Sequence, residues 1–132
     1  MKLVLAGVLL VGFSIACHAG DGLCIRHADV PVYPVLGWQA QLQGFVVLNV
    51  DIAPDGEVVS VSASGANKLL QKAAADNIRT WRFCSALAKQ NVTITYVYNL
   101  EGEETDHMPR EKVVLDIPEQ IIITSRPPMP QG

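Results

Sequence analysis

Three cysteines are the residues of this 132-residue chain whose chemistry is easiest to infer. Cys17 lies in an N-terminal apolar run, whereas Cys24 and Cys84 lie in the body of the chain. If the chain is exported to an oxidising compartment, two cysteines in one small domain favour a disulfide over a pair of buried free thiols. The sequence therefore predicts a Cys24–Cys84 bridge, which would stabilise the fold by ~4 kcal/mol in the chain-entropy model.

The other reactive side chains form no catalytic or metal-binding pattern. His27 and His107 lack paired ligand spacing, and the sequence has no Cys-x-x-Cys motif. Ser64-Gly65 could be imagined as a nucleophile turn, but it lacks the flanking pattern of such turns, so a structural turn is the simpler interpretation. We therefore expect no enzymatic activity, no cofactor and no metal.

The N-terminus has the pattern of a secretory signal peptide. Lys2 precedes an apolar run over residues 3–16, and small residues follow up to Gly20. We expect residues 1–19 to be removed, which leaves a periplasmic or secreted chain. The alternatives are a lipid anchor at Cys17 and a retained membrane anchor, although the run is shorter than the ~20 residues that a spanning helix needs.

The remainder of the chain fits a single small domain. About 110 residues suffice for one modest core. The formal net charge of −3 gives no basic surface for nucleic acid, and no small-molecule site is evident. We expect a domain over residues 20–126, with its core at 31–101 and an added strand at 112–124. A Pro-rich tail would follow at 127–132.

A β-hairpin is the clearest element of the sequence. In residues 44–52, apolar side chains alternate along one face of an expected strand: Val46, Leu48, Val50 and Ile52. Pro54-Asp55-Gly56 has the residue types of a tight turn, and β-branched residues return over 57–63.

Two helices are expected on either side of this hairpin. Residues 35–43 can form a short helix that ends before Gly44. Asn67 can cap an amphipathic helix over residues 68–81. Its apolar stripe would consist of Leu70, Ala73, Ala74, Ile78 and Trp81.

A further strand is expected at residues 92–100, and residues 113–124 offer more β-type sequence, divided by Pro118. One face of the strand at 92–100 would carry Thr93, Thr95, Val97 and Asn99. The expected fold class is α+β, with an antiparallel three- to four-stranded sheet and two helices packed on one face.

Six features of residues 33–83 follow one another in an order typical of a known family. They are Tyr33-Pro34, Gly44 before the strand, Asp55-Gly56, Ser64-Gly65, Ala73-Ala74 and Trp81-Arg82-Phe83. The stretch resembles the C-terminal domain of the TonB energy transducers, which link an inner-membrane motor to outer-membrane receptors for nutrients such as iron chelates.

The resemblance implies a protein partner that binds by strand addition, either an outer-membrane receptor segment or another envelope protein. In this mode main-chain hydrogen bonds supply the affinity. By resemblance, the accepting edge is the strand at 92–100 with Thr93, Thr95, Val97 and Asn99, and Tyr33 and Pro34 lie close to the contact. A homodimer is a further option.

A second interpretation is a free-standing exported interaction or structural domain with no energy-transducing role. It is favoured by the expected signal peptide and by the lack of a long Pro/Lys-rich spacer. Residues 113–124 could also pair beside the strand at 92–100 and cover the accepting edge, as native proteins often do with exposed edge strands.

Overall fold

The computed structural model describes residues 23–108, 112–116 and 120–130. The expected signal peptide, including Cys17, lies outside the described residues. The elements follow the order β1 (Ile25–His27), α1 (Val35–Gln39), β2 (Gly44–Ile52), β3 (Val58–Gly65), α2 (Lys68–Ile78), β4 (Arg82–Phe83), β5 (Gln90–Leu100), β6 (Lys112–Asp116) and β7 (Gln120–Ser125).

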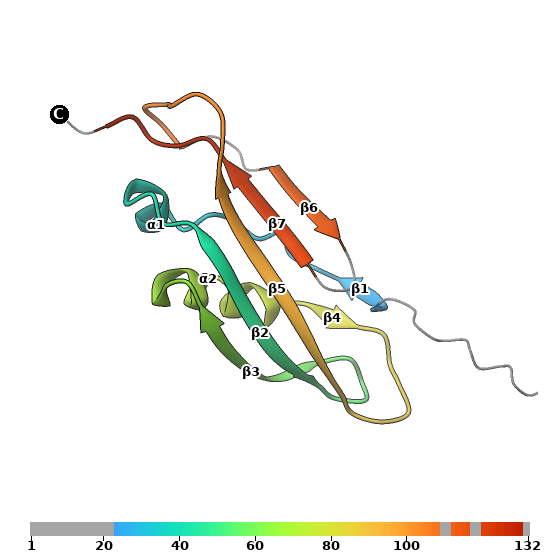
Figure 1. The fold of residues 1–132 in the computed structure, drawn as a ribbon. Coiled ribbons are helices and arrows are strands. Elements are labelled where there is room, and N and C mark those ends of the chain that lie inside the picture. Colours follow the sequence, from blue (N-terminus) through green and yellow to red (C-terminus); the bar gives the residue numbers. More distant parts are fainter. Residues whose placement is uncertain (1–22, 109–111, 117–119, 131–132) are drawn as a thin grey trace, which may run out of the picture.

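The main sheet has five strands in the order β3-β2-β5-β7-β6, and β1 pairs with β4 in a separate two-stranded sheet (Figure 1). The expected α+β class is confirmed, and the expected antiparallel sheet of three to four strands is only roughly matched, because the observed sheet differs from it in two respects. The sheet is wider, and β7 runs parallel to β5. β6 runs opposite to β5 and β7 reverses again, so β7 runs in the same direction as β5; because β7 and not β6 takes the inner place, the pairing with β5 is parallel.

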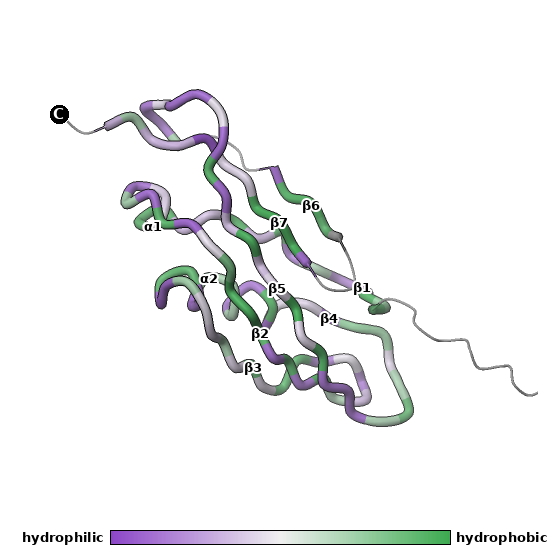
Figure 2. Tube along the Cα trace, viewed as in Figure 1, coloured by the Kyte–Doolittle hydropathy of each residue, from purple (hydrophilic) through white to green (hydrophobic). Residues whose placement is uncertain are grey.

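One face of the sheet forms the core. The alternation predicted for residues 44–52 is confirmed, because Val46, Leu48, Val50 and Ile52 are all buried. They pack in one cluster with side chains from both helices, among them Trp38 of α1 and Leu70 and Ile78 of α2. Figure 2 shows that hydrophobic residues recur along β2, β5 and β7, the strands at the centre of this cluster.

Both helices are shorter than the sequence predicts. α1 ends at Gln39, and Gln41 has a positive φ of 56°, which stops the helix before residue 43. α2 ends at Ile78 because the next backbone bonds tighten, with the N–H groups of Thr80 and Trp81 donating to carbonyls three residues back. Trp81 therefore reaches the core from beyond the helix rather than from its stripe.

The start of α2 agrees with the prediction. The Asn67 side-chain oxygen accepts from the backbone N–H groups of Leu69 at 2.7 Å and Leu70 at 3.4 Å. These bonds satisfy donors that have no partner within the helix.

A half-buried asparagine near the end of α2 ties the helix to the rest of the fold. The Oδ1 atom of Asn77 accepts from the Tyr96 hydroxyl at 2.6 Å and from the Trp81 indole N–H at 3.1 Å. Its Nδ2 group donates to the carbonyl of Asp29 at 2.9 Å. Asn77 thus joins α2 to the sheet and to the segment that precedes α1.

The segment after β7 folds back onto the domain. The Thr105 N–H donates to the Pro127 carbonyl, and the Met129 N–H donates to the Thr105 carbonyl. The Trp38 indole also donates to the Arg126 carbonyl at 2.6 Å. Residues 127–130 of the expected tail are therefore held against the loop after β5, while residues 131–132 lie outside the described part. No helix in the described ranges is both long and apolar enough to span a bilayer.

Candidate partner-binding edge

The outer face of β5 carries the four residues that the sequence assigns to partner contact. Their neighbours Ile94, Tyr96 and Tyr98 are buried in the core. Because successive side chains of a strand point to opposite faces, Thr93, Thr95, Val97 and Asn99 share the face away from the helices. On β2, Asn49, Val47 and Phe45 stand opposite the first three of these residues.

A partner strand would pair with β5 along its side away from β2, and β7 of the chain itself occupies most of that side. β7 pairs with β5 from Thr95, opposite Gln120, to Leu100, opposite Ser125. Figure 1 shows β7 lying between β5 and β6. Of the expected contact residues on β5, only Thr93 precedes this pairing. Among the described residues, no strand pairs with Gln90–Ile94 on the side away from β2.

Two isoleucines attach β7 to the core. Ile121 and Ile123 both have 0% exposure, and they stand beside Tyr96 and Tyr98 of β5 on the inner face. Two of the described polar groups near the end of the β5–β7 pairing lack hydrogen-bond partners. Within the described chain, the buried hydroxyls of Tyr98 and Ser125 have no hydrogen-bond partner. Each such hydroxyl costs about 1–3 kcal/mol relative to one with a partner.

Tyr33 lies beneath the edge rather than on the surface. Its side chain is 1% exposed, its hydroxyl donates to the Leu42 carbonyl at 2.5 Å, and its ring meets that of Tyr98 edge-to-face at 5.4 Å. Burial raises the pKa of Tyr33 to about 12 and also raises the pKa values of Tyr96 and Tyr98. All three phenols therefore stay neutral near pH 7.

Pro34 directly precedes α1, and its carbonyl accepts from the Trp38 N–H at 2.8 Å. The Tyr33-Pro34 pair thus fixes where the chain enters the helix. In this conformation the Tyr33 side chain is not presented to solvent. It contacts Tyr98 of β5 inside the core instead.

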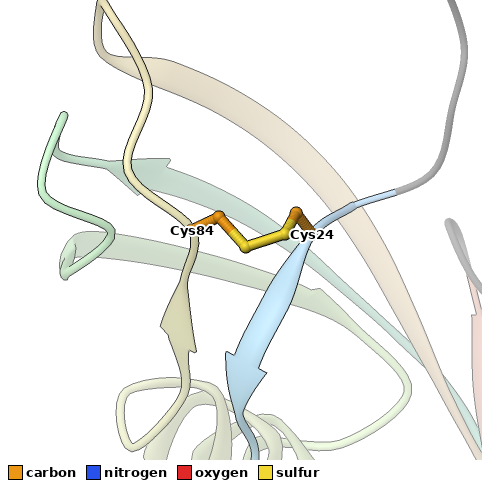
Figure 3. The surroundings of a disulfide bond; sticks show 2 residues. All are labelled: Cys24 and Cys84. Carbon is orange, nitrogen blue, oxygen red and sulfur yellow. A yellow bond between two sulfur atoms is a disulfide. The ribbon is translucent and has the colours of Figure 1, made fainter.

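A disulfide joins Cys24 and Cys84, as the sequence predicts (Figure 3). Their Cα atoms are 5.4 Å apart, and the Cys84 N–H donates to the Cys24 carbonyl at 2.9 Å. Cys84 follows β4 and not the end of α2, so the bridge extends the β1–β4 pairing. It fixes the segment before α1 to the strand that carries the buried Phe83.

The polar clusters elsewhere are small and exposed. At the far end of the sheet the Asp51 carboxylate accepts from Ser60 and Asn91, and these bonds lower its pKa. His27 pairs with Asp29 and His107 with Asp106. Over the ranges that the structure covers, no three potential metal ligands come together.

The comparisons with known proteins agree on one family. The family of Gram-negative bacterial TonB protein C-terminal regions matches residues 29–101. Two curated relatives, each described as Protein TonB, are 40% identical to this chain over 60 residues. They come from Xanthomonas campestris pv. campestris, strains B100 and ATCC 33913, and the match covers 44% of this chain and 27% of each relative. The chain thus spans about a quarter of the length of these relatives.

The matched region ends just after β5. It contains Tyr33, Pro34 and all four outward residues of β5, whereas β6 and β7 lie beyond it. The segment that covers the expected partner edge is therefore outside the part of the chain that matches the family.

Proposed function

The chain belongs to the family of Gram-negative bacterial TonB protein C-terminal domains, and on this basis we propose that it is a periplasmic protein-binding domain of energised outer-membrane transport. It captures an extended segment of an outer-membrane receptor or another envelope protein as an added β-strand. β5 is the accepting strand, with Thr93, Thr95, Val97 and Asn99 along the contact.

The observation that carries this proposal is the coincidence of the matched region with the accepting edge. Residues 29–101 include β5, its neighbour β2 and the Tyr33-Pro34 pair that packs beneath Tyr98. β5 is the long central strand of the sheet, and it is fully paired with β2 from Gln90 to Tyr98. A rigid strand of this length offers a straight row of main-chain groups, which is what strand addition requires.

Capture along the whole of β5 requires β7 to leave. Exposing Ile121 and Ile123 costs about 3–6 kcal/mol, at roughly 1.5–3 kcal/mol for each buried side chain. The lost main-chain hydrogen bonds are replaced by those of the incoming strand, so their net effect is small. A partner segment with apolar residues at the positions of Ile121 and Ile123 offsets the remaining cost. We propose that partner binding exchanges one strand for the other.

A second function is favoured by β7 itself. If the β6–β7 hairpin stays in place, the chain is a free-standing interaction or structural domain of the envelope without an energy-transducing role. The two functions differ in whether β5 ever loses its pairing with β7.

The test is a titration of the ¹⁵N-labelled chain with synthetic peptides from the periplasmic segments of outer-membrane receptors. Strand exchange predicts that a binding peptide shifts the amides of Thr93–Asn99 and moves those of β7 toward the positions of an unpaired chain. The matched control is the same peptide with alternate backbone nitrogens methylated, which removes the donors and should abolish binding. Binding that survives methylation, or that leaves the β5 amides unchanged, contradicts capture at this edge.

A further inference from the structure

The first part of β5, residues 90–94, has an open side. Among the described residues, no strand pairs with this open stretch on the side away from β2, because β7 begins its pairing at Thr95. Figure 1 shows the open stretch extending beyond the start of β7. Alternate residues of a strand direct their main-chain groups to each side, so some donors and acceptors here have no partner strand in the described chain. An extended segment can pair with the open stretch without displacing any described strand.

The β6–β7 hairpin covers the rest of this side of β5, and it is attached to the domain at one end. The loop after β5 reaches the hairpin at the start of β6, which stands opposite Thr124 near the end of β7. At the other end, where the chain reverses from β6 to β7, Gln120 lies beside Thr95 and next to the open stretch. The hairpin therefore has the topology of a flap with a hinged end and a free end.

The segment after β7, residues 126–130, forms a strap at the hinged end of the flap. The Trp38 indole N–H donates to the Arg126 carbonyl at 2.6 Å, and the Arg126 Nε donates to the Glu103 carbonyl at 2.9 Å. The main chain of Thr105 makes two further bonds with the strap, and this threonine is buried. In Figure 1 the loop after β5 (orange) and the strap (red) run side by side. These bonds lie beyond the β5–β7 ladder and close the hinge.

The rest of the flap is held less firmly. In the described chain β6 pairs with β7 alone, and the side chains of Val114 and Leu115 are exposed. On the inner face, Val113 and Leu115 border an apolar groove of about 300 Å³, whose other side consists of Trp81 and residues 28–31. Side chains that border such a space lack close partners on one side, so they gain less from packing than fully enclosed ones.

We propose that the open stretch is the entry site for a partner strand, and that the flap opens from its free end while the strap keeps its hinge closed. The partner segment first pairs with residues 90–94 and then takes the places of residues 120–124 one pair at a time. Each new main-chain pair on β5 replaces one that β7 gives up, so no step exposes the whole of β5. This inference rests on the proposed function, because it describes how the same site opens.

The chemistry of the partner strand follows from the residues that it adjoins. A strand parallel to β5, as β7 is, directs alternate side chains toward the core. Beside Val92 and Ile94 these side chains meet the same apolar cluster that Ile121 and Ile123 meet further along. The other side chains face solvent with Thr93. The site therefore takes an extended segment in which apolar and polar residues alternate.

Two synthetic peptides that carry part of the β7 sequence test the entry site. In the first, Lys-Thr-Val-Thr-Val precedes Gln-Ile-Ile-Ile-Thr, which is the sequence of residues 120–124. Its first half can pair along the open stretch. The matched control has the same halves in reverse order, so its added half extends past Asn99 instead. Fluorescence anisotropy of each dye-labelled peptide with the purified full chain gives its association rate, and the first should associate about tenfold faster or more, because the added cross-strand pairs stabilise its first contact.

Two engineered disulfides test the direction of opening. Thr95→Cys with Gln120→Cys joins neighbours at the free end of the flap, and its oxidised form should bind the first peptide about tenfold more weakly, or worse, than its reduced form. Thr105→Cys with Pro128→Cys joins neighbours at the strap, and its two forms should bind equally. The unmodified chain, measured with and without the reductant, controls for reduction of Cys24–Cys84.

Amide hydrogen exchange measures the opening without a peptide. In the unmodified chain, the β7 amides bonded to β5 should exchange faster near Gln120 than near Thr124. Trp38→Phe keeps the aromatic ring but removes the donor to the Arg126 carbonyl. It should speed exchange near Thr124 roughly three- to tenfold, which is the effect of one lost hydrogen bond.

The proposal is overturned if the two peptides associate at the same rate, or if neither binds. It is also overturned if the strap disulfide abolishes binding, or if exchange is faster near Thr124 than near Gln120. Designed peptides that bind as expected while receptor peptides do not would contradict only the proposed function. Receptor peptides that shift the β5 amides while the designed peptides associate equally would contradict only the entry site.

Discussion

Weakening the attachment of β7 should make partner capture easier. Ile123 is fully buried against the inner face of β5, next to Tyr98. Ile123→Ala removes this contact, and such a change in a packed core costs about 2–4 kcal/mol. If β7 must leave before a partner segment can pair with β5, the same amount disappears from the cost of exchange. Peptide affinity should then rise roughly 30- to 1,000-fold.

The matched control is Ile52→Ala. Ile52 is as buried as Ile123 but lies at the end of β2, where it pairs with β3 and the start of β5. It should lower global stability by a similar amount without raising peptide affinity. Affinity is measured by isothermal titration calorimetry, and the opening of β7 by amide hydrogen exchange. Equal peptide affinities for the two variants, or no gain for Ile123→Ala, would refute displacement of β7.

Three further predictions concern what holds the domain together. Asn77→Ala removes the acceptor of the Tyr96 hydroxyl and of the Trp81 indole, so we expect the free energy of unfolding to fall by about 2–4 kcal/mol. Urea unfolding followed by tryptophan fluorescence measures this change, and a loss below about 1 kcal/mol would contradict the role of Asn77. Replacing Cys24 and Cys84 together by serine should cost about 2–4 kcal/mol, and an unchanged melting temperature would contradict the prediction. The pKa of Asp51 is lowered by its bonds from Ser60 and Asn91, so its stabilising effect is full above the ordinary carboxyl pKa and disappears as the pH falls through the lowered value. Asp51→Asn should therefore be less stable than the parent chain at pH 7 but equally stable at pH 2, and a difference that persists in acid would exclude the carboxylate as its source.

Local patterns predicted the parts of the fold that depend on neighbouring residues. The alternation along β2, the Asn67 cap and the turn after β2 follow from side-chain periodicity and capping chemistry. The Cys24–Cys84 bridge followed from the small number of cysteines and the expected compartment.

The predictions that failed concern features that depend on tertiary contacts. Trp81 has the spacing of the α2 stripe, so periodicity alone could not show that the helix ends at Ile78. Whether β5 gains an antiparallel or a parallel neighbour depends on which strand of the β6–β7 hairpin takes the inner place, and both segments are apolar enough to do so. Asn77 gave no signal as a single polar residue on a helix, because two of its three partners, Asp29 and Tyr96, come from distant parts of the chain.

For the candidate site, the sequence correctly placed the four outward residues of β5 on one face, and it anticipated that residues 113–124 could pair beside this strand and occupy its edge. It did not foresee that Tyr33 would be buried beneath Tyr98. A Tyr-Pro pair before a short helix is compatible with a surface contact or with a core anchor, and only packing distinguishes the two. Whether these residues contact a partner stays a prediction.

The most direct test of the account is the set of cross-strand NOEs at Val97 in the presence and absence of a bound receptor peptide. In the free chain, Val97 should show NOEs to Ile122 of β7, its neighbour in the ladder. Strand exchange predicts that these NOEs disappear at saturation and that peptide NOEs to Thr95, Val97 and Asn99 replace them. Persistent Val97–Ile122 NOEs in a saturated complex would mean that β7 stays in place, and would contradict capture along β5.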